Sequence, residues 1–421
     1  SLSGHERSTY ERSSSSLQYP QTGVSDMFMF EDNVFDGVEA VNNMVGTVLV
    51  NIQNIPFSFD FKNNTMANCK DMRTLVSISM TSQGSISPQV LVSGGHWHDN
   101  TVEEHIFELT GTSIVANGIL IENNVMTSGV VFALFLSTQP MGTRTVQFTS
   151  ITASGNHRTG GDDFGGVVVF LSSASDVVDD IQIVDCTFET NKQLSQNVHN
   201  GGSVLYYEAQ SITTQVTVYI GGSTFTGNEA VAQGAAIYVS HTDCTNAQSS
   251  PCSFALTIEN VVAENNKATD DGTTASHAGV VHVTQVSQLY LRHSTFSGNS
   301  ITAASITDPC SGIFIGVSSA TDSTYEFENL TVSNQSSGFI QVYPSAGLTA
   351  TYQVLFSDIT ANSIGGAFAA VIGADVVSMT DSRFNTGLGS EALLYLSTCK
   401  NLEMDNVTVT DFASGTAAPN L

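Results

Sequence analysis

IQIVDCTFETN, at residues 181–191, joins two alternating apolar residues to a polar turn, a further apolar residue and an asparagine. The same template recurs as VYIGGSTFTGN at 218–228, LYLRHSTFSGN at 289–299 and VQFTSITASGN at 146–156. In each copy the further apolar residue, called the anchor below, follows the second alternating residue by five positions and precedes the asparagine by three. Apolar residues with a period of two predict β-strands. The template therefore predicts short strands joined by polar turns.

The template extends along most of the chain. Counted by the anchor, it has thirteen copies, at Phe35, Met66, Trp97, Met126, Ala153, Phe188, Phe225, Ala263, Phe296, Val332, Ile359, Phe384 and Val409. Most copies are followed by a second apolar run announced by glycine, as in GGSVLYY from Gly201 and GAAIYVS from Gly234. Such repeats, without helical periodicity, indicate a parallel β-solenoid whose coils stack on one another. A β-propeller or tandem β-sandwiches are the alternatives, but both need antiparallel hairpins with tight turns, which the template rarely offers.

Two polar columns accompany the anchors. Asn or Asp stands three residues before many anchors, and these residues tolerate the left-handed backbone that sharp turns require. Asn stands three residues after many anchors, where side-chain amides on successive coils can hydrogen-bond as a ladder. The predicted ladder contains Asn100, Asn156, Asn191, Asn228, Asn266, Asn299 and Asn362.

A family resemblance accompanies these motifs. The F-x-x-N pattern (FETN, FTGN, FSGN), followed by strands such as GGSVLYY and GGAFAAV, resembles the repeats of chlamydial polymorphic outer-membrane proteins. It is similar also to surface proteins of the pectin-lyase-like superfamily. The resemblance implies an all-β, right-handed, single-stranded parallel β-helix of about thirteen coils. We expect a polar N-terminal arm at 1–25, the β-helix at 26–412 and a C-terminal tail at 413–421.

The composition restricts the partners. The chain of 421 residues has 39 acidic and 12 basic residues, and its formal net charge is −27. Such a charge argues against binding to nucleic acid or to anionic membrane surfaces. No stretch approaches the roughly 18–20 apolar residues that a membrane-spanning helix needs. We therefore expect an extracellular or cell-surface protein that does not itself span a membrane and has no resident cofactor.

A histidine-rich stretch, SGGHWHDNTVEEH at 93–105, suggests a metal site. Trp97 is an anchor and points inward, so His96 and His98 point outward on the same strand face. The two imidazoles could hold zinc, or a calcium ion could bind nearby, with Glu103 or Glu104 as a further ligand. The alternative is an ordinary solvated strand face.

Cysteines and glycosylation sequons allow further predictions. Cys244 and Cys252 bracket a short loop and are expected to form a disulfide. Cys69, Cys186, Cys310 and Cys399 fall on coils too far apart for bridges, and we expect four free thiols. N-x-S/T sequons occur at Asn63, Asn329, Asn334 and Asn406. Asn334 lies outside the turn column and is expected to face solvent.

Catalysis finds little support in the sequence, and no catalytic residue is assigned. The adjacent acids Asp162–Asp163, Asp179–Asp180 and Asp270–Asp271 are interpreted as solvated turns or weak calcium contacts. Asp381 and Arg383 are two residues apart and could pair on one strand face. A polysaccharide lyase or glycoside hydrolase is the alternative function, because enzymes of both kinds share this fold.

The expected function is structural or adhesive. The expected partners are other copies of the chain, surface or matrix proteins, and carbohydrate. Residues 1–24 carry Arg7 and Arg12 and are too poor in apolar residues to fold alone. We expect this arm to lie along a neighbouring copy while coil ends meet head to tail and build a filament, a glycoprotein if the sequons are used. The alternatives are that the arm is disordered, or that the chain is one piece of a longer one.

Overall fold

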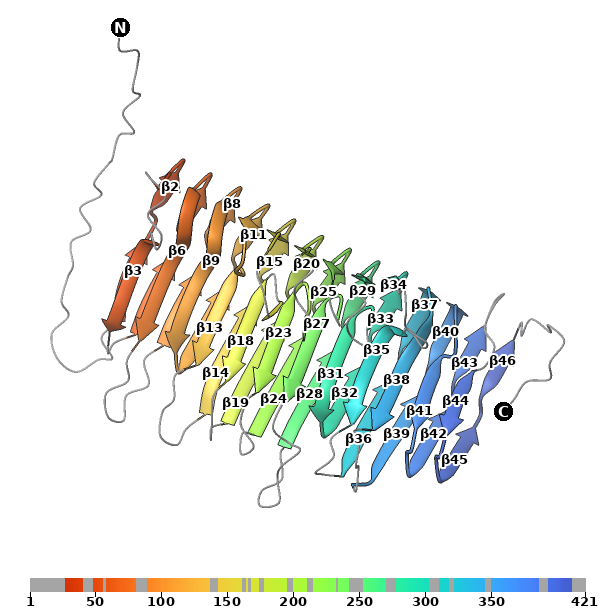
Figure 1. Cartoon of the computed structure of the whole chain (residues 1–421). Helices are drawn as coiled ribbons and strands as arrows, with labels where there is room; N and C mark the ends of the chain where they lie inside the picture. Colours follow the sequence, from red (N-terminus) through yellow and green to blue (C-terminus); the bar gives the residue numbers. More distant parts are fainter. Residues whose placement is uncertain are drawn as a thin grey trace, which may run out of the picture.

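The computed structural model describes residues 27–40, 48–55, 58–80, 89–136, 143–160, 164–165, 168–173, 178–194, 200–209, 215–231, 234–241, 253–269, 278–302, 310–317, 322–344, 350–385 and 393–410. Within these residues the chain is all β, and every strand pairing is parallel (Figure 1). The expected arm at 1–25, the tail at 413–421, and Cys244, Cys252, Asp162, Asp163, Asp270 and Asp271 lie outside them. The prediction of a parallel, solenoid-like β-fold is confirmed at this level, and the antiparallel alternatives are wrong.

Sheet A contains thirteen strands. They are β1 (Met27–Glu31), β4 (Ser58–Lys62), β7 (Gln89–Ser93), β10 (Ser113–Asn117), β14 (Thr143–Thr149), β19 (Val178–Val184), β24 (Gln215–Gly221), β28 (Ser253–Glu259), β32 (Gln288–Arg292), β36 (Ser323–Glu328), β39 (Tyr352–Ser357), β42 (Val376–Thr380) and β45 (Asn401–Asp405). These strands carry the alternating apolar pair of the template.

Sheet B also contains thirteen strands, and these carry the anchors. They are β2 (Val34–Asp36), β5 (Thr65–Ala67), β8 (His96–His98), β11 (Leu120–Glu122), β15 (Thr152–Ser154), β20 (Thr187–Glu189), β25 (Thr224–Thr226), β29 (Val262–Glu264), β33 (Thr295–Ser297), β37 (Thr331–Gln335), β40 (Thr360–Ile364), β43 (Arg383–Asn385) and β46 (Thr408–Thr410).

Sheet C contains the strands that follow the anchors, which are short polar strands as well as the apolar runs of the template. Its strands are β3 (Val48–Ile55), β6 (Lys70–Met80), β9 (Thr101–Gly111), β12 (Val125–Met126), β13 (Phe132–Leu136), β16 (His157–Arg158), β18 (Val169–Ser173), β21 (Lys192–Gln193), β23 (Leu205–Ala209), β26 (Glu229–Ala230), β27 (Ile237–His241), β30 (Lys267–Thr269), β31 (Val281–Val286), β34 (Ser300–Thr302), β35 (Cys310–Val317), β38 (Gly338–Pro344), β41 (Ala369–Ile372) and β44 (Leu394–Ser397). The long strand β9 pairs with both β12 and β13, so the sheet continues from there as two parallel stacks. A separate pair joins β17 (Phe164–Gly165) and β22 (Asn200–Gly201).

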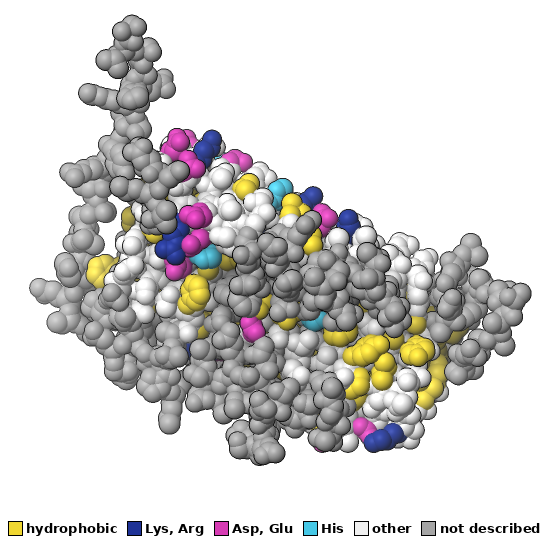
Figure 2. All heavy atoms as spheres, in the orientation of Figure 1, with side chains coloured by type: hydrophobic (Ala, Val, Ile, Leu, Met, Phe, Trp, Pro, Cys, Tyr) yellow, Lys and Arg dark blue, Asp and Glu magenta, His cyan; other side chains and the backbone are white. Residues whose placement is uncertain are grey.

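The core lies between the three sheets. Strand β19 shows the pattern, because Ile181 and Ile183 are buried while Gln182 between them is half-buried. The register continues each inward position from coil to coil, so identical positions of the template stack in columns. Anchors such as Trp97, Phe188 and Phe225 are almost completely buried. Toward the C-terminal end of the face drawn in Figure 2, hydrophobic side chains reach the surface.

Two turns with left-handed backbone flank each strand of sheet B wherever the structure describes them. Three residues before the anchor position, φ is positive at Asp32, Asn63, Gly94, Gly118, Ser150, Asp185, Gly222, Asn260, His293, Asn329, Asp358, Asp381 and Asn406. Two residues after it, φ is positive at Gly37, Asn68, Asp99, Asn123, Gly155, Thr190, Gly227, Asn265, Gly298, Asn334 and Ser363. Asn, Asp and Gly dominate both columns because they adopt this conformation at low steric cost.

Two predicted anchors are wrong. Ile121 pairs with Trp97, and Ala361 pairs with Val332, so these residues replace Met126 and Ile359 as anchors. In the first case Asn123 forms the turn after the anchor rather than the turn before it. In the second case the alanine is less apolar than its neighbour Ile359, which is buried at the turn. No helix in the described part of the chain is long and apolar enough to cross a membrane.

Candidate functional site

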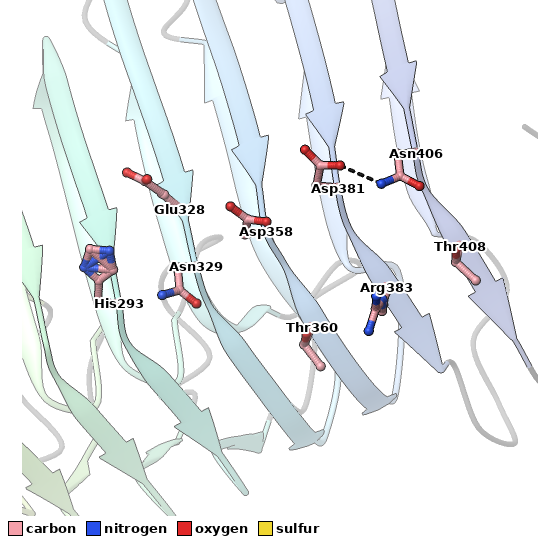
Figure 3. Close-up of a pocket in the computed structure, with 9 residues that line it drawn as sticks. All are labelled: His293, Glu328, Asn329, Asp358, Thr360, Asp381, Arg383, Asn406 and Thr408. Atoms are coloured by element: carbon pink, nitrogen blue, oxygen red, sulfur yellow. Dashed lines mark hydrogen bonds between the residues drawn. The ribbon is translucent and has the colours of Figure 1, made fainter.

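A polar groove runs along the corner between sheets A and B over the last five coils that the structure describes (Figure 3). Its volume is about 660 Å³. Nine residues line it: His293, Glu328, Asn329, Asp358, Thr360, Asp381, Arg383, Asn406 and Thr408. We call this site the corner groove.

The left-handed turn before the anchor builds the floor of the corner groove. His293, Asn329, Asp358, Asp381 and Asn406 occupy this turn position on successive coils, with φ values between 47° and 53°. Neighbouring strands of a sheet lie about 4.8 Å apart, so the groove offers one polar side chain per coil at that spacing. Figure 3 shows these side chains in a row that crosses the strands.

The outward positions of sheet B and one position of sheet A complete the lining. Thr360, Arg383 and Thr408 immediately precede their anchors and therefore point away from the core. Glu328, the last residue of β36, accepts a salt bridge of 3.3 Å from Arg292 Nε at the groove's edge. Asn406 Nδ2 donates a hydrogen bond of 2.6 Å to Asp381 Oδ1 inside it.

The corner groove combines three carboxylates with one guanidinium, one imidazole, two amides and two hydroxyls. Asp381 and Arg383, which the sequence suggested as a pair, both belong to its lining. Groups of this kind bind ligands that carry many hydroxyl groups, because carboxylates accept hydrogen bonds and amides both donate and accept them. Sequence reasoning did not find the groove. Acidic residues stand at the turn position of two successive coils, Asp358 and Asp381, but also at Asp32 and Asp185 outside the groove, so they do not locate it.

His96 and His98 lie on the outer face of β8, as expected, and the core side chain Trp97 lies between them. Their ring centroids are 4.2 Å apart. His96 Nε2 lies 2.9 Å from Glu122 Oε2 of the next coil. Glu104, one of the expected further ligands, instead pairs with Arg73 at 2.7 Å. No group of three or more His, Cys, Asp or Glu side chains in the described residues is arranged to hold a metal ion.

The asparagine column forms a continuous chain of hydrogen bonds from Asn100 to Asn299. Each side-chain Nδ2 donates to the Oδ1 of the next rung at 2.8–3.1 Å, in the order Asn100, Asn124, Asn156, Asn191, Asn228, Asn266 and Asn299. Every rung is completely buried. Asn124 belongs to the ladder although the sequence did not predict it. Asn362 does not, because with Ala361 as anchor the ladder position passes to Ile364 and Asn362 is exposed.

All four sequon asparagines are exposed and have left-handed backbones. Their φ values are 52° at Asn63, 49° at Asn329, 52° at Asn334 and 51° at Asn406. Asn334 occupies the turn after the anchor, outside the turn column that the sequence emphasised. Asn329 and Asn406 line the corner groove, so a glycan on either would enter it.

Four cysteines in the described residues are free: Cys69, Cys186, Cys310 and Cys399. Burial raises the pKa of the Cys186 thiol to about 11 and that of Cys310 to about 12. A thiol that is protonated at neutral pH is a poor nucleophile and a poor metal ligand. These two cysteines therefore contribute to the core rather than to chemistry.

Asp179 corrects another expectation. It does not lie in a solvated turn with Asp180, because its side chain is completely buried in the core between the sheets. Its carboxylate accepts a salt bridge of 2.7 Å from Arg144 and a hydrogen bond of 3.1 Å from the Tyr207 hydroxyl. The Arg144 guanidinium also donates to the carbonyl of Leu136 at 3.3 Å. The site is a buried ion pair with additional hydrogen bonds.

His105 makes stability depend on pH. Burial lowers the pKa of its imidazole from 6.5 to about 4, and Nδ1 accepts a hydrogen bond of 3.2 Å from the Val130 amide. His105 thus binds a proton more readily in the unfolded chain than in the folded protein. The stability that depends on neutral His105 is therefore complete above pH 6.5 and is lost as the pH falls toward 4. We expect the loss to be about 3 kcal/mol. Asparagine at position 105 can keep the hydrogen-bond acceptor but does not titrate. In His105→Asn, the loss of stability between pH 7 and pH 4.5, measured by thermal unfolding, should therefore be smaller than in the unaltered protein. An equal loss in both proteins would contradict the assignment.

Comparisons with family models, with curated proteins and with solved structures each found no match.

Proposed function

We propose that this protein is an extracellular structural or adhesive rod, a subunit of a surface assembly that binds carbohydrate along the corner groove. As finer features we propose a right-handed winding of about thirteen coils, of the kind that the resemblance to chlamydial polymorphic outer-membrane proteins implies, and glycosylation at Asn63 and Asn334, the two exposed sequons outside the corner groove. Metal binding by His96 and His98 is not part of the proposal.

The observation that carries the proposal is the repeating polar lining of the corner groove. One turn side chain per coil, about 4.8 Å from the next, offers the same kind of contact again and again along the rod. A linear polysaccharide also repeats its hydroxyl groups along its length, so successive sugars can use equivalent side chains. Many weak polar contacts in a row give avidity without a deep pocket.

One observation favours the enzymatic alternative. Asp358 and Asp381 stand on adjacent coils, with Arg383 beside them in the groove. Glycoside hydrolases use two carboxylates that flank the scissile bond. A polysaccharide that binds here could therefore also be cleaved, and binding has to be measured together with the release of reducing ends or unsaturated products.

The test is a pair of double variants with unchanged net charge. Asp358→Asn with Arg383→Ala alters the corner groove, and the asparagine keeps a residue that tolerates the left-handed turn. We expect binding to acidic and neutral polysaccharides, measured by affinity electrophoresis and calorimetry, to weaken at least tenfold. Glu104→Gln with Arg73→Ala removes one acidic and one basic surface side chain outside the groove, which pair with each other at 2.7 Å, and should leave binding unchanged.

Protein from a host that does not glycosylate has to be used, since a glycan on Asn329 or Asn406 would enter the groove. Equal binding by both double variants would show that the corner groove is not the site. If the unaltered protein releases cleavage products and the groove variant does not, the enzymatic alternative replaces the adhesive role.

A further inference from the structure

Tyr219 projects outward from strand β24 of sheet A, close to the corner between sheets A and B. Its neighbours Val218 and Ile220 point inward and are buried, whereas Tyr219 is half-buried. Among the described residues, no other aromatic side chain and no cation stacks on its ring. The ring is therefore a partly apolar surface on an otherwise polar face.

A glycine makes room for this ring. Gly221, two residues after Tyr219, is the only glycine at its position in the thirteen strands of sheet A. A Cβ atom on Gly221 would lie 2.6 Å from the ring atoms Cε1 and Cζ of Tyr219. The neighbouring coils carry Val184 and Glu259 at this position. The Tyr219 ring thus leans along its strand into space that a side chain fills in the other coils.

Two carboxylates flank the Tyr219 ring. Its hydroxyl donates a hydrogen bond of 3.5 Å to Glu259 Oε2 in the next coil. In the preceding coil, Asp185 Oδ1 occupies the space that a Cβ atom on Gly222 would need. Burial and the charges of Glu259 and Asp185 raise the pKa of the Tyr219 hydroxyl, so it stays protonated at neutral pH.

This arrangement continues the corner groove toward the N-terminal coils. Glu259 Oε1 lies 3.8 Å from Nδ1 of His293, which lines the groove. Strand β24 lies two strands before β32, the sheet A strand in the coil of His293, and this separation is about 9.6 Å. A polymer that lies in the groove can therefore reach Tyr219.

We infer that Tyr219 is a stacking subsite for one pyranose unit of the polysaccharide, at the N-terminal end of the corner groove. The inference rests on the proposed function, because it adds a contact for the same ligand. The face of an aromatic ring is negative, so it attracts the C–H groups on the flat face of a pyranose with equatorial hydroxyls. Asp185 and Glu259 can accept hydrogen bonds from hydroxyls at the edge of that sugar.

A cation is the competing ligand, since an aromatic ring and two carboxylates also attract an ammonium group. A single ring that is exposed to water contributes little to cation binding. A glucose-type polymer instead uses the ring, the flanking carboxylates and the polar row of the groove together. The observations therefore favour an uncharged polymer of pyranoses with equatorial hydroxyls.

Cellohexaose is the probe, because it is uncharged and its glucose units carry equatorial hydroxyls. Calorimetry on protein without glycans should show binding that Tyr219→Ala weakens about tenfold. Tyr219→Phe keeps the ring and should bind like the unaltered protein. Gly221→Ala places a Cβ atom in the space of the ring and should weaken binding although the tyrosine remains. The control Phe135→Ala removes a ring on β13 that is 38% exposed and should leave binding unchanged.

The groove variant, Asp358→Asn with Arg383→Ala, separates this inference from the proposed function. If only the groove variant loses affinity, the subsite is wrong and the groove stands. If only Tyr219→Ala loses affinity, the subsite stands and the groove is wrong. Absence of cellohexaose binding to the unaltered protein, or equal losses in Tyr219→Ala and Phe135→Ala, would overturn the subsite. Binding of tetramethylammonium that Tyr219→Ala abolishes would identify a cation site and overturn the assignment to sugar.

Discussion

Replacement of Asn191 by alanine is expected to lower the free energy of unfolding by about 4 kcal/mol or more. The Asn191 carboxamide makes four hydrogen bonds: it accepts from the backbone N and the Nδ2 of Asn156, and it donates to Ala153 O and Asn228 Oδ1. Both neighbouring rungs are completely buried. Alanine leaves their polar groups without partners and without water. Each buried group that loses its partner costs about 1–3 kcal/mol.

In Asn191→Ala, stability should fall near the ladder as well as across the whole protein. Trp97 is the only tryptophan and is completely buried, so its fluorescence reports unfolding in urea. Hydrogen exchange at the Asn156 amide should accelerate, because that amide loses its acceptor. The matched control is Asn362→Ala, an exposed asparagine of the same repeat template, for which we expect a change within about 0.5 kcal/mol. Similar changes for the two variants would show that the ladder does not stabilise the stack.

The repeat template predicted the architecture because local rules and the global fold agree in almost every copy. Period-two alternation selects strands, and Asn, Asp or Gly at fixed offsets supplies the left-handed turns on both sides of each anchor. The template failed at Met126 because Asn123, which forms the turn after Ile121, was assigned to the turn before an anchor. It failed at Ile359 because that residue is larger and more apolar than the true anchor Ala361. Those errors hid Asn124 from the ladder and placed Asn362 in it.

The corner groove could not be predicted in the same way. It consists of surface residues whose alignment depends on the register of five coils, and the loops between copies differ in length. An acidic residue at a turn position serves the turn equally well in every coil, so the sequence does not distinguish turns that line a groove from turns that do not. The buried ion pair of Arg144 and Asp179 could not be predicted for a similar reason. Arg144 and Asp179 are 35 residues apart and meet only because β14 pairs in register with β19.

Asp179→Ala is expected to destabilise the protein by about 3–5 kcal/mol. The exposed fractions of the Arg144 and Asp179 side chains are 1% and 0%, so removal of the carboxylate leaves a positive charge in the core without its counter-ion. The Tyr207 hydroxyl loses its acceptor at the same time. A surface pair gives the comparison. Arg292 pairs with Glu326 at 2.7 Å, but its side chain is 36% exposed, and Arg292→Ala should cost less than about 1 kcal/mol.

A double variant separates the cost of the unpaired charge from the value of the ion pair. Val216 and Phe254 continue the column of Arg144 and Asp179 in the next two coils, so leucine at both positions extends an apolar column. Replacement of a buried pair by apolar residues of similar size is often neutral or stabilising. Arg144→Leu with Asp179→Leu should therefore recover most of the stability that Asp179→Ala loses, as measured by the urea midpoint of Trp97 fluorescence. If the double variant is as unstable as the single one, the ion pair and its bond to Tyr207 hold these coils together in a way that apolar packing cannot replace.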